Sequence, residues 1–499
     1  MRATRPIALA LSVAALAAGA LVAAQAAPPS AVPAGPAAEP AQVQLGKDRY
    51  GPSRLGANGR NVVFVLTDDM RVDDLRYMPS VRRLIGRRGV SFTNAYAVDP
   101  VCCPSRVSIL TGQYGHSSGV LGNFFPRGGF AAFHDDESIA TWLDERGYTT
   151  GYFGKYLNQY GKTARRYVPP GWDTWQAAVR GVYAYRDPTV YNIDGQLETK
   201  PPYQADTLTR MATSFITGNT DRKMFVHVAY STPHQAVEGT ALGQPPVPAL
   251  RHEHSYDGMQ APVGDPAYDE DDVSDKAKVI RRRHLTARQH TRIRFFTEVR
   301  RESLLAVDEG VAEIVATLKR ERLLDRTTIV FASDNGFFLG EHRYPGGKHL
   351  PYEPVAQVPL LMRGPGIPQG VTRPHVVGLH DLAPTFLGLT GSTGAQGRFP
   401  IDGTNLLPFV RDRGGAATGR DLLIESLARE TRWRSYDAIR TTSGYKYVEY
   451  AARGVELYDL GADPSETENL ARRPRYGDLR DRLARRLDAV RSCGGAQCR

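Results

Sequence analysis

The feature that most constrains the fold is a repeated alternation of short apolar runs with longer helical patterns. Five runs rich in β-branched and aromatic residues predict buried strands at Asn61–Thr67, Thr149–Gly154, Met224–Tyr230, Thr327–Ser333 and Val358–Met362. Helical periodicity between them predicts helices at Ser138–Arg146, Asp206–Thr217, Thr286–Lys319 and Leu382–Leu389. Strands that alternate with helices favour an α/β domain with a large, mostly parallel sheet flanked by helices.

A smaller region follows a break in this pattern. The break lies at Arg411–Thr418, where Gly and Ala interrupt the apolar spacing. Beyond it, short runs predict a small sheet and a terminal amphipathic helix, at Asp421–Ser426, Asp437–Thr441, Lys446–Tyr450 and Arg475–Arg491. We therefore expect a larger catalytic domain over residues 59–412 and a C-terminal α+β subdomain over residues 413–499.

The segment Arg251–Arg283 is polar and rich in charge. It contains a run of acidic residues at Asp269–Asp272 and three arginines at Arg281–Arg283. This composition predicts a surface excursion rather than a domain boundary. The excursion lies either near the rim of a site or in a solvated loop with no role.

The first residues predict export. Arg2 and Arg5 precede an apolar run, and the Ala-Gln-Ala sequence ending at Ala26 fits a small-residue cleavage site. The run is short and Ala-rich for a membrane span, which needs about 20 strongly apolar residues. We expect a signal peptide over residues 1–26, a Pro/Ala-rich linker over 27–58, and a secreted or extracytoplasmic protein without a stable membrane anchor.

The four cysteines divide into two pairs. In an oxidising compartment, Cys493 and Cys498 predict a small disulfide loop near the C-terminus. Cys102 and Cys103 are adjacent, and a bridge between neighbours has unfavourable geometry. At least one of these two is therefore predicted to be reactive.

The charge of the chain limits its partners without selecting one. The formal net charge is +10, which favours polyanions such as nucleic acid, acidic lipid or sulfated polysaccharide. A basic soluble protein without such a partner is an equal alternative. The sequence has no aromatic-studded basic stripe and no zinc-ligand spacing, so we expect no nucleic-acid partner.

Polar residues follow two of the predicted strands. Asp68 and Asp69 come directly after the first strand, and Asp334 and Asn335 directly after the fourth. In open α/β sheets, ligands gather at the carboxyl ends of strands. Carboxylate and amide oxygens suit Ca²⁺ or Mg²⁺ rather than zinc. The two pairs predict a cation site, although an Asp after a strand also commonly caps a helix.

The strongest local signal is the run Cys102–Arg106 (CCPSR), followed by a Leu-Thr-Gly segment that ends at Gly112. Pro104 suits the first turn of a helix, whose N-terminus would direct positive charge toward an anion. The motif resembles the signature of the sulfatase family. The resemblance implies that Cys102 is oxidised to formylglycine by a formylglycine-generating enzyme, with Cys103 as the variable position. It also implies that Arg106 steadies the nucleophile.

The family resemblance implies a fold and a chemistry. The fold is an alkaline-phosphatase-like sandwich, in which a large central sheet is flanked by helices and followed by a smaller subdomain. One hydroxyl of the hydrated formylglycine attacks sulfur, and the other later expels sulfate as the aldehyde re-forms. The implied ligands of Ca²⁺, or alternatively Mg²⁺, are Asp68, Asp69, Cys102, Asp334 and Asn335.

Three further residues lie in contexts that match the family. Lys155 follows the strand at Thr149–Gly154, His234 ends a Ser-Thr-Pro-His sequence, and Lys348 ends a Gly-Gly-Lys sequence. The resemblance implies that these residues bind sulfate and protonate the leaving alcohol, with His234 as the general acid. His349, the neighbour of Lys348, is an alternative to Lys348 for the residue that this motif supplies.

Other positions depart from the family pattern or lie outside it. Many sulfatases carry a His two residues after the Lys matched by Lys155, and here that position is Leu157. His116 is either a substitute for the missing His or a structural histidine. Asp73 and Asp74 are predicted to be solvated or to cap a helix.

The resemblance covers nearly the whole chain from about Arg60. Finer features resemble the N-acetylglucosamine-6-sulfatase branch, namely CCPSR, the sequence Gly154–Asn158 (GKYLN) and the terminus Ser492–Arg499. We therefore expect hydrolysis of a sulfate ester in a sulfated carbohydrate or aryl sulfate, with the 6-O-sulfate of N-acetylglucosamine or a related glycan as the first expectation. The alternatives are a phosphate- or phosphonate-ester hydrolase of the same fold, and an inactive protein that binds anionic glycans.

Overall fold

The computed structural model describes residues 60–499, apart from 202, 237–242, 279, 394–396, 413–419, 427–434 and 453. The predicted signal peptide and linker lie outside the described residues, as does most of the predicted break at Arg411–Thr418. The division at residues 412 and 413 therefore stays a prediction. Within the described part, no helix is long and apolar enough to cross a membrane.

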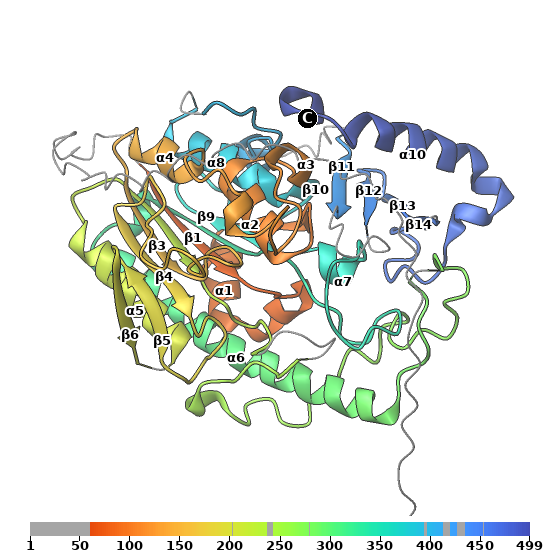
Figure 1. Cartoon of the computed structure of the whole chain (residues 1–499), viewed down its shortest axis with the longest axis horizontal. Helices are drawn as coiled ribbons and strands as arrows, with labels where there is room; N and C mark the ends of the chain where they lie inside the picture. The colour runs from red at the N-terminus through yellow and green to blue at the C-terminus, as the bar shows by residue number, and fades with distance from the viewer. Residues whose placement is uncertain are drawn as a thin grey trace, which may run out of the picture. The chain divides into compact units, whose positions relative to one another are not determined.

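A mixed sheet forms the centre of the fold (Figure 1). Among the described residues its strands are, in spatial order, β10 (Val371–Gly378), β2 (Val90–Tyr96), β9 (Leu360–Arg363), β8 (Thr327–Ser333), β1 (Asn61–Thr67), β7 (Met224–Ala229), β3 (Thr149–Gly154), β4 (Thr174–Arg180), β5 (Thr189–Ile193) and β6 (Gln196–Lys200). The central strands β8, β1, β7, β3 and β4 run parallel, whereas β9 and β5 are antiparallel to their neighbours. The expected mostly parallel sheet is confirmed.

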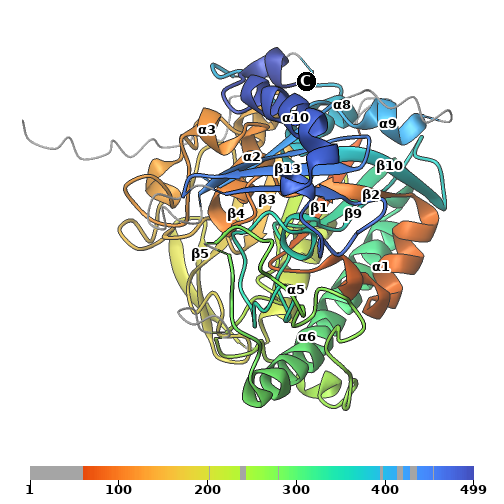
Figure 2. The same ribbon diagram turned by 90° about the vertical axis from the view of Figure 1, so that its right-hand side faces the viewer.

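Helices cover both faces of this sheet, as the two views in Figures 1 and 2 show. In β1, Val62, Phe64 and Leu66 join one hydrophobic cluster, and Val63 and Val65 join the other. The helices that pack on the first face are α2 (Cys102–Thr111), α4 (Ile139–Asp144) and α8 (Leu382–Thr390), and those on the second are α1 (Pro79–Leu84), α5 (Gln204–Gly218) and α6 (Ala287–Arg320). Burial on both faces explains why this strand is a continuous apolar run in the sequence.

The central elements lie where the sequence predicts them. Strands β1, β3 and β8 have the predicted bounds, and β7, β9 and the four predicted helices differ from prediction only at their ends. The strands that were not predicted are β2, β4, β5, β6 and β10. Most of these lie toward the ends of the sheet, and β6 (QLETK) is largely exposed. Exposed strands carry polar residues, so their sequences lack the apolar run of a buried strand.

A second, smaller sheet lies in the C-terminal region. Its antiparallel strands are β11 (Leu422–Ser426), β12 (Tyr436–Arg440), β13 (Tyr445–Tyr450) and β14 (Val455–Asp459). Helix α10 (Gly477–Val490) packs on β12 and β13 and buries Leu483 and Leu487. Cys493 and Cys498 form the predicted disulfide. The expected α+β region is confirmed, with β14 as the strand that was not predicted.

The charged segment Arg251–Arg283 is largely exposed, as a surface excursion predicts, but a part of it is anchored in the fold. Lys276 is fully buried and its ammonium donates to Glu270 and to the carbonyl of Thr467. Ala277 packs in the hydrophobic cluster of the C-terminal sheet. The charge of Lys276 is neutralised by nearby carboxylates, so this part of the polar segment is buried, whereas Arg281–Arg283 are exposed.

Candidate active site

Two parallel strands bring the predicted cation ligands together. Asp68 and Asp69 follow β1, and Asp334 and Asn335 follow its neighbour β8, with all four side chains buried. The backbone N–H of Asp69 donates to Asp334 Oδ1 at 3.2 Å, and the amide of Asn335 donates to Asp69 Oδ1 at 2.6 Å. Asp69 has φ 65°, a left-handed conformation that a non-glycine residue rarely adopts. Such a backbone is often found at functional sites.

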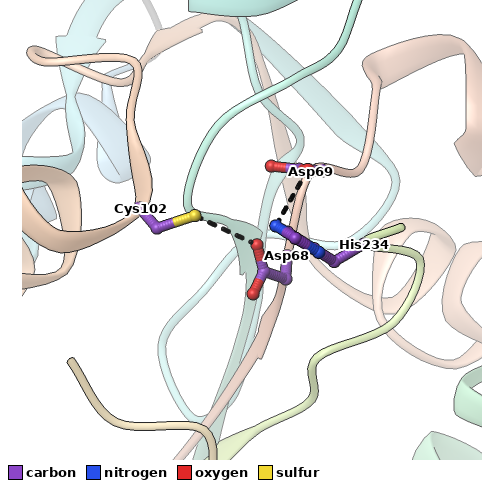
Figure 3. A group of neighbouring side chains, drawn as sticks. All are labelled: Asp68, Asp69, Cys102 and His234. Atoms are coloured by element: carbon purple, nitrogen blue, oxygen red, sulfur yellow. Dashed lines mark hydrogen bonds and ion pairs between the residues drawn. The ribbon is translucent and has the colours of Figure 1, made fainter. Parts of the chain in front are cut away.

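Helix α2 brings Cys102 to the same place. The helix begins at Cys102, and all of its residues are buried. Cys102 Sγ lies 3.5 Å from Asp68 Oδ1 (Figure 3). It also lies 2.6 Å from the ammonium of Lys348. Burial, reinforced by Asp68, raises the pKa of the Cys102 thiol above its ordinary value. The other cysteine of the motif, Cys103, is also buried and lies in the hydrophobic core.

Arg106 forms hydrogen bonds with the residues that directly follow three strands, β1, β8 and β3. Its Nε donates to Asp334 Oδ2 at 2.7 Å, its Nη2 to Asp68 Oδ2 at 3.2 Å, and its Nη1 to the carbonyl of Lys155 at 2.7 Å. Burial acts to raise the pKa of Asp68, but Lys155 and other cations lower it below its usual range. Burial together with Asp68 raises the pKa of Asp334 to about 6.

Two lysines neutralise the paired aspartates. The Lys155 ammonium donates to Asp68 Oδ2, and the Lys348 ammonium donates to Asp69 Oδ1 at 2.5 Å. Burial acts to lower the pKa of both lysines, but the carboxylates raise it above its ordinary value. Of the two neighbours left open by the sequence, Lys348 is the one whose charged group reaches Asp69 and Cys102. The backbone N–H of His349 donates to the carbonyl of a proline ahead of Cys102.

His234 approaches the aspartates from the side opposite Cys102 (Figure 3). Its Nε2 lies 3.7 Å from Asp69 Oδ2, and its Nδ1 lies 2.8 Å from the carbonyl of Gln235. A carbonyl accepts, so Nδ1 carries a proton and Nε2 is the nitrogen that faces the site. The ring of Tyr183 stacks on the imidazole at a centroid distance of 4.1 Å. Burial lowers the pKa of His234, although the aspartates oppose it.

The side chains present fit a hard cation. Among the described residues, ligand atoms of Asp68, Asp69, Cys102 and His234 lie within 4.8 Å of one another. Asn335 Oδ1 is buried beside them without a hydrogen-bond partner, and an unpaired buried acceptor needs an explanation. Carboxylate and amide oxygens are the ligands that Ca²⁺ and Mg²⁺ prefer. Both carboxylate oxygens of Asp334 accept hydrogen bonds, one from the backbone N–H of Asp69 and the other from Arg106.

His116 contacts the C-terminal region rather than the residues of the site. Its Nδ1 lies 2.9 Å from Glu425 Oε2 and its Nε2 lies 2.9 Å from the carbonyl of Cys493. Burial acts to lower the pKa of His116, but Glu425 raises it to about 9. These contacts give His116 a structural role. Leu157, at the position where many sulfatases have a His, packs in the hydrophobic core.

Three residues near the site were not identified from the sequence as its parts. Tyr183 stacks on His234, and its loop sequence carries no motif. Arg300 of α6 is fully buried and donates to the carbonyl of Asp69. Asp74 caps the turn that follows Asp69, which is one of its two predicted roles. The other, a solvated side chain, is wrong, because Asp74 is buried and pairs with Arg300. Charged residues in a helical or turn pattern are usually solvated, so the sequence gives no signal for these contacts.

Comparisons with known sequences match almost the whole described chain. A family model for sulfatases matches residues 60–392, and a model for the C-terminal part of N-sulphoglucosamine sulphohydrolase matches residues 340–493. An arylsulfatase of Volvox carteri is 30% identical, covering 88% of this chain and 75% of the relative. A human N-acetylglucosamine-6-sulfatase is 27% identical, with 89% and 86% covered. An extracellular sulfatase SULF-1 homologue of Drosophila melanogaster is 32% identical over 80% of this chain but only 35% of the relative.

Solved structures share the fold. A complex of a protein with its substrate d-glucosamine-2-N,6-O-disulfate has a TM-score of 0.69 at 22% identity, covering 86% of this chain and 97% of the other. A phosphonate monoester hydrolase of Agrobacterium radiobacter has a TM-score of 0.63 at 21% identity, covering 87% and 95%. The fold is therefore common to enzymes that act on different esters. The fold alone does not distinguish these enzymes, whereas the sulfatase family model does. Its match to residues 60–392 shows that this chain belongs to the sulfatase family.

Proposed function

We propose that the protein is an exported enzyme that hydrolyses sulfate esters of a glycan, in the first place the 6-O-sulfate of N-acetylglucosamine or a related sugar. The observation that carries the proposal is the position of Cys102. Its sulfur lies at the first turn of α2, within 2.6 Å of the Lys348 ammonium and 3.5 Å of Asp68. A nucleophile there lies beside the ammonium group of Lys348 and at a helix N-terminus, which together favour an anionic substrate.

The proposed nucleophile is a formylglycine made from Cys102 by a formylglycine-generating enzyme. As a hydrate, this group would supply the hydroxyl that attacks sulfur and the hydroxyl whose deprotonation releases sulfate. The lysines at positions 155 and 348 grip the sulfate oxygens through their ammonium groups. Arg106 keeps Asp68 and Asp334 in place through the hydrogen bonds of its planar guanidinium. Nε2 of His234 faces the site and protonates the leaving sugar hydroxyl.

The proposed ligands of a divalent cation, Ca²⁺ or alternatively Mg²⁺, are Asp68, Asp69, Asp334, Asn335 and the oxidised Cys102. Oxidation of Cys102 replaces its sulfur by oxygen, which makes the whole ligand set hard. Asn335 Oδ1 is buried without a hydrogen-bond partner, so a cation would satisfy it. When bound, the cation would withdraw charge from the sulfate group and lower the pKa of the attacking hydroxyl.

Two comparisons support the substrate class and the compartment. N-acetylglucosamine-6-sulfatases are relatives over most of this chain, and the net charge of +10 suits a polyanionic substrate. A relative that is an extracellular sulfatase, the N-terminal sequence and the disulfide Cys493–Cys498 all support export.

The test combines mass spectrometry of the protein with a comparison of its rates on different esters. Mass spectrometry of protein from its native host is expected to find formylglycine at Cys102 and a cysteine at Cys103. The same protein is expected to have a higher kcat/KM for a nitrophenyl sulfate than for the matching phosphate or phosphonate esters. A preference for phosphonate would favour the hydrolase represented by the Agrobacterium structure. Glycan binding without turnover, in protein that carries formylglycine, would favour an inactive binding protein.

A further inference from the structure

A single buried arginine connects two parts of the candidate active site. Helix α6, the long green helix in Figure 1, carries Arg300, whose side chain is fully buried. Its Nη2 donates to the carbonyl of Asp69 at 2.6 Å, and its Nη1 donates to the carbonyl of Pro233 at 3.3 Å. Pro233 directly precedes His234. One rigid group therefore holds the backbone beside a predicted cation ligand and the backbone beside the proposed acid.

The charge of Arg300 is balanced away from the reacting groups. Its Nη2 lies 3.2 Å from Asp74 Oδ2, and its guanidinium lies over the ring of Phe337 at 5.1 Å. The side chain of Asp69 is left to Lys348 and Asn335. Arg300 thus acts on the backbone of the site and does not compete for its carboxylates.

The backbone that Arg300 holds is one that needs support. Asp69 has φ 65°, a left-handed conformation that is strained for a residue other than glycine. A charged donor on the carbonyl of Asp69 stabilises this conformation more than a neutral donor would. The guanidinium is planar, so the two carbonyls it binds keep a fixed separation, which a lysine cannot impose.

We propose that Arg300 is a positioning residue that sets the place of His234 relative to Asp69. Nε2 of His234 lies 3.7 Å from Asp69 Oδ2 in this arrangement. The inference rests on the proposed role of His234 as the acid that protonates the leaving alcohol. Proton transfer depends steeply on position, and a displacement of about 1 Å can lower a rate by about 10²-fold. Loss of Arg300 is therefore expected to weaken the acid step rather than the binding of sulfate.

The neighbouring arginine is a matched control. Arg301 is 2% exposed and pairs with Asp74 and Asp73 at 3.4 and 3.3 Å. Its guanidinium lies over the ring of Tyr77 at 4.3 Å. Arg301 thus shares the helix, the burial and the carboxylate of Asp74 with Arg300, but its described side-chain partners do not include the backbone carbonyls of Asp69 and Pro233.

The experiment compares Arg300→Lys with Arg301→Lys, using a nitrophenyl sulfate and a sugar 6-sulfate. Nitrophenolate leaves without a proton, whereas a sugar alcohol needs one. Arg300→Lys is expected to lower kcat for the sugar sulfate by about 10²-fold, with a much smaller change for the aryl sulfate and little change in KM. Arg301→Lys is expected to lower the thermal midpoint similarly but to leave the ratio of the two rates unchanged. Equal losses on both substrates in Arg300→Lys would overturn the proposal.

Two further measurements separate this proposal from the proposed function. In a His234→Ala background, Arg300→Lys is expected to change the ratio of the two rates no further, because both substitutions act on one step. If Arg300→Lys does not fold, the charge-balanced variant Asp74→Asn/Arg300→Gln takes its place. A wild-type enzyme without activity on either ester would overturn the proposed function. A crystal structure of the variant would then decide the role of Arg300 through the distance between His234 Nε2 and Asp69 Oδ2. A distance that stays at 3.7 Å would contradict the positioning role.

Discussion

Two clusters of buried charge, among several in the described part of the chain, differ in what their charged groups face. In the candidate active site, the ammonium groups of Lys155 and Lys348 approach Asp68, Asp69 and Cys102 from different elements. The groups converge on a thiol that is proposed to react. The cations and anions of this cluster would therefore rearrange their partners when a sulfate enters.

The other cluster joins the C-terminal sheet to the central domain. Lys446 of β13 is fully buried and lies 2.6 Å from Glu466, 2.8 Å from Glu353 and 2.7 Å from the carbonyl of Pro351. Three acceptors saturate the ammonium group. Glu466 also accepts from the backbone N–H of Glu353 at 2.7 Å. Because Glu353 begins the short helix that follows the Lys348 loop, this cluster anchors that loop to the C-terminal sheet.

The difference shows which observations identify a reactive site. Shifted pKa values do not, because burial raises the pKa of Asp334 to about 6 in one cluster and that of Glu466 to about 7 in the other. A left-handed backbone does not either, because Asp69 has φ 65° and Glu466 has φ 57°. The candidate active site is distinguished instead by the thiol of Cys102, which lies beside Asp68 and Lys348, and by Asn335 Oδ1, a buried acceptor without a hydrogen-bond partner. Unsatisfied buried groups persist where function requires them. We therefore expect substitutions in the first cluster to reduce activity and those in the second to reduce stability.

The largest effect is expected for Cys102→Ala. Removal of the nucleophile should lower kcat by about 10⁴-fold or more, as in other enzymes with covalent catalysis. The thermal midpoint should change little, because a small buried side chain is replaced by a slightly smaller one. Cys103→Ala is the matched control, since Cys103 is equally buried but packs in the core. Full activity of Cys102→Ala would show that the site uses another nucleophile.

A smaller but still large effect is expected for Asp334→Asn. The change removes a charged oxygen from the proposed ligand set and should lower cation affinity and kcat/KM together by about 10²-fold or more. Calcium titration and elemental analysis are the measurements. Asp308→Asn is the control, because the buried Asp308 accepts from the backbone N–H groups of Ser80 and Val81, which are not proposed ligands. Stoichiometric zinc, or full activity without any divalent metal, would contradict the proposed site.

The sequence predicted the parts of the active site that depend on local pattern. The apolar runs that form β1 and β8 end directly at Asp68 and Asp334, so parallel pairing alone brings these residues together. The CCPSR motif likewise begins α2 at Cys102. A site residue can be predicted from the sequence when it lies at the end of a strand or the start of a helix, because the local pattern then determines its place in the fold.

The parts that could not be predicted depend on packing between distant segments. Arg300 belongs to a helix whose sequence is rich in charge, and nothing local shows that it reaches Asp69 across more than two hundred residues. Lys446 and Glu466 are likewise buried, although lysine and glutamate side chains are mostly exposed in folded proteins. Tertiary contacts set burial, and a single sequence without a repeating motif does not reveal them.

A selective effect is expected for His234→Ala. The departure of a sugar alcohol requires a proton, so kcat/KM for a sugar 6-sulfate should fall by about 10²–10⁴-fold. The rate for a nitrophenyl sulfate should fall much less, because nitrophenolate leaves without protonation. Parallel losses on the two substrates would assign His234 to sulfate binding and would make Lys348 the next candidate for the acid. The thermal midpoint should stay within a few degrees, which distinguishes this variant from those of the C-terminal cluster.

The smallest effect on activity, with a distinct effect on stability, is expected for Glu466→Gln. Burial raises the pKa of Glu466 from 4.5 to about 7. Lys446 opposes this shift, and the negative charge of Glu353, which lies beside the same ammonium group, adds to it. The folded state therefore binds this proton more tightly than the unfolded state does. The stability that follows is complete below pH 4.5 and is lost as the pH rises through about 7.

The glutamine resembles the protonated side chain at every pH, so the variant should lose this pH dependence. For a fully buried group, the wild-type free energy of unfolding should fall by up to about 3 kcal/mol between pH 4.5 and 7 through Glu466 alone. Urea unfolding at intervals across this range measures the slope, which should be shallower in Glu466→Gln. The value of kcat/KM per folded molecule should change by less than about twofold, because Glu466 contacts Glu353 and Lys446 and no proposed catalytic group. An unchanged slope would mean that another group carries the pH dependence, and a large loss of kcat/KM would erase the distinction between the two clusters.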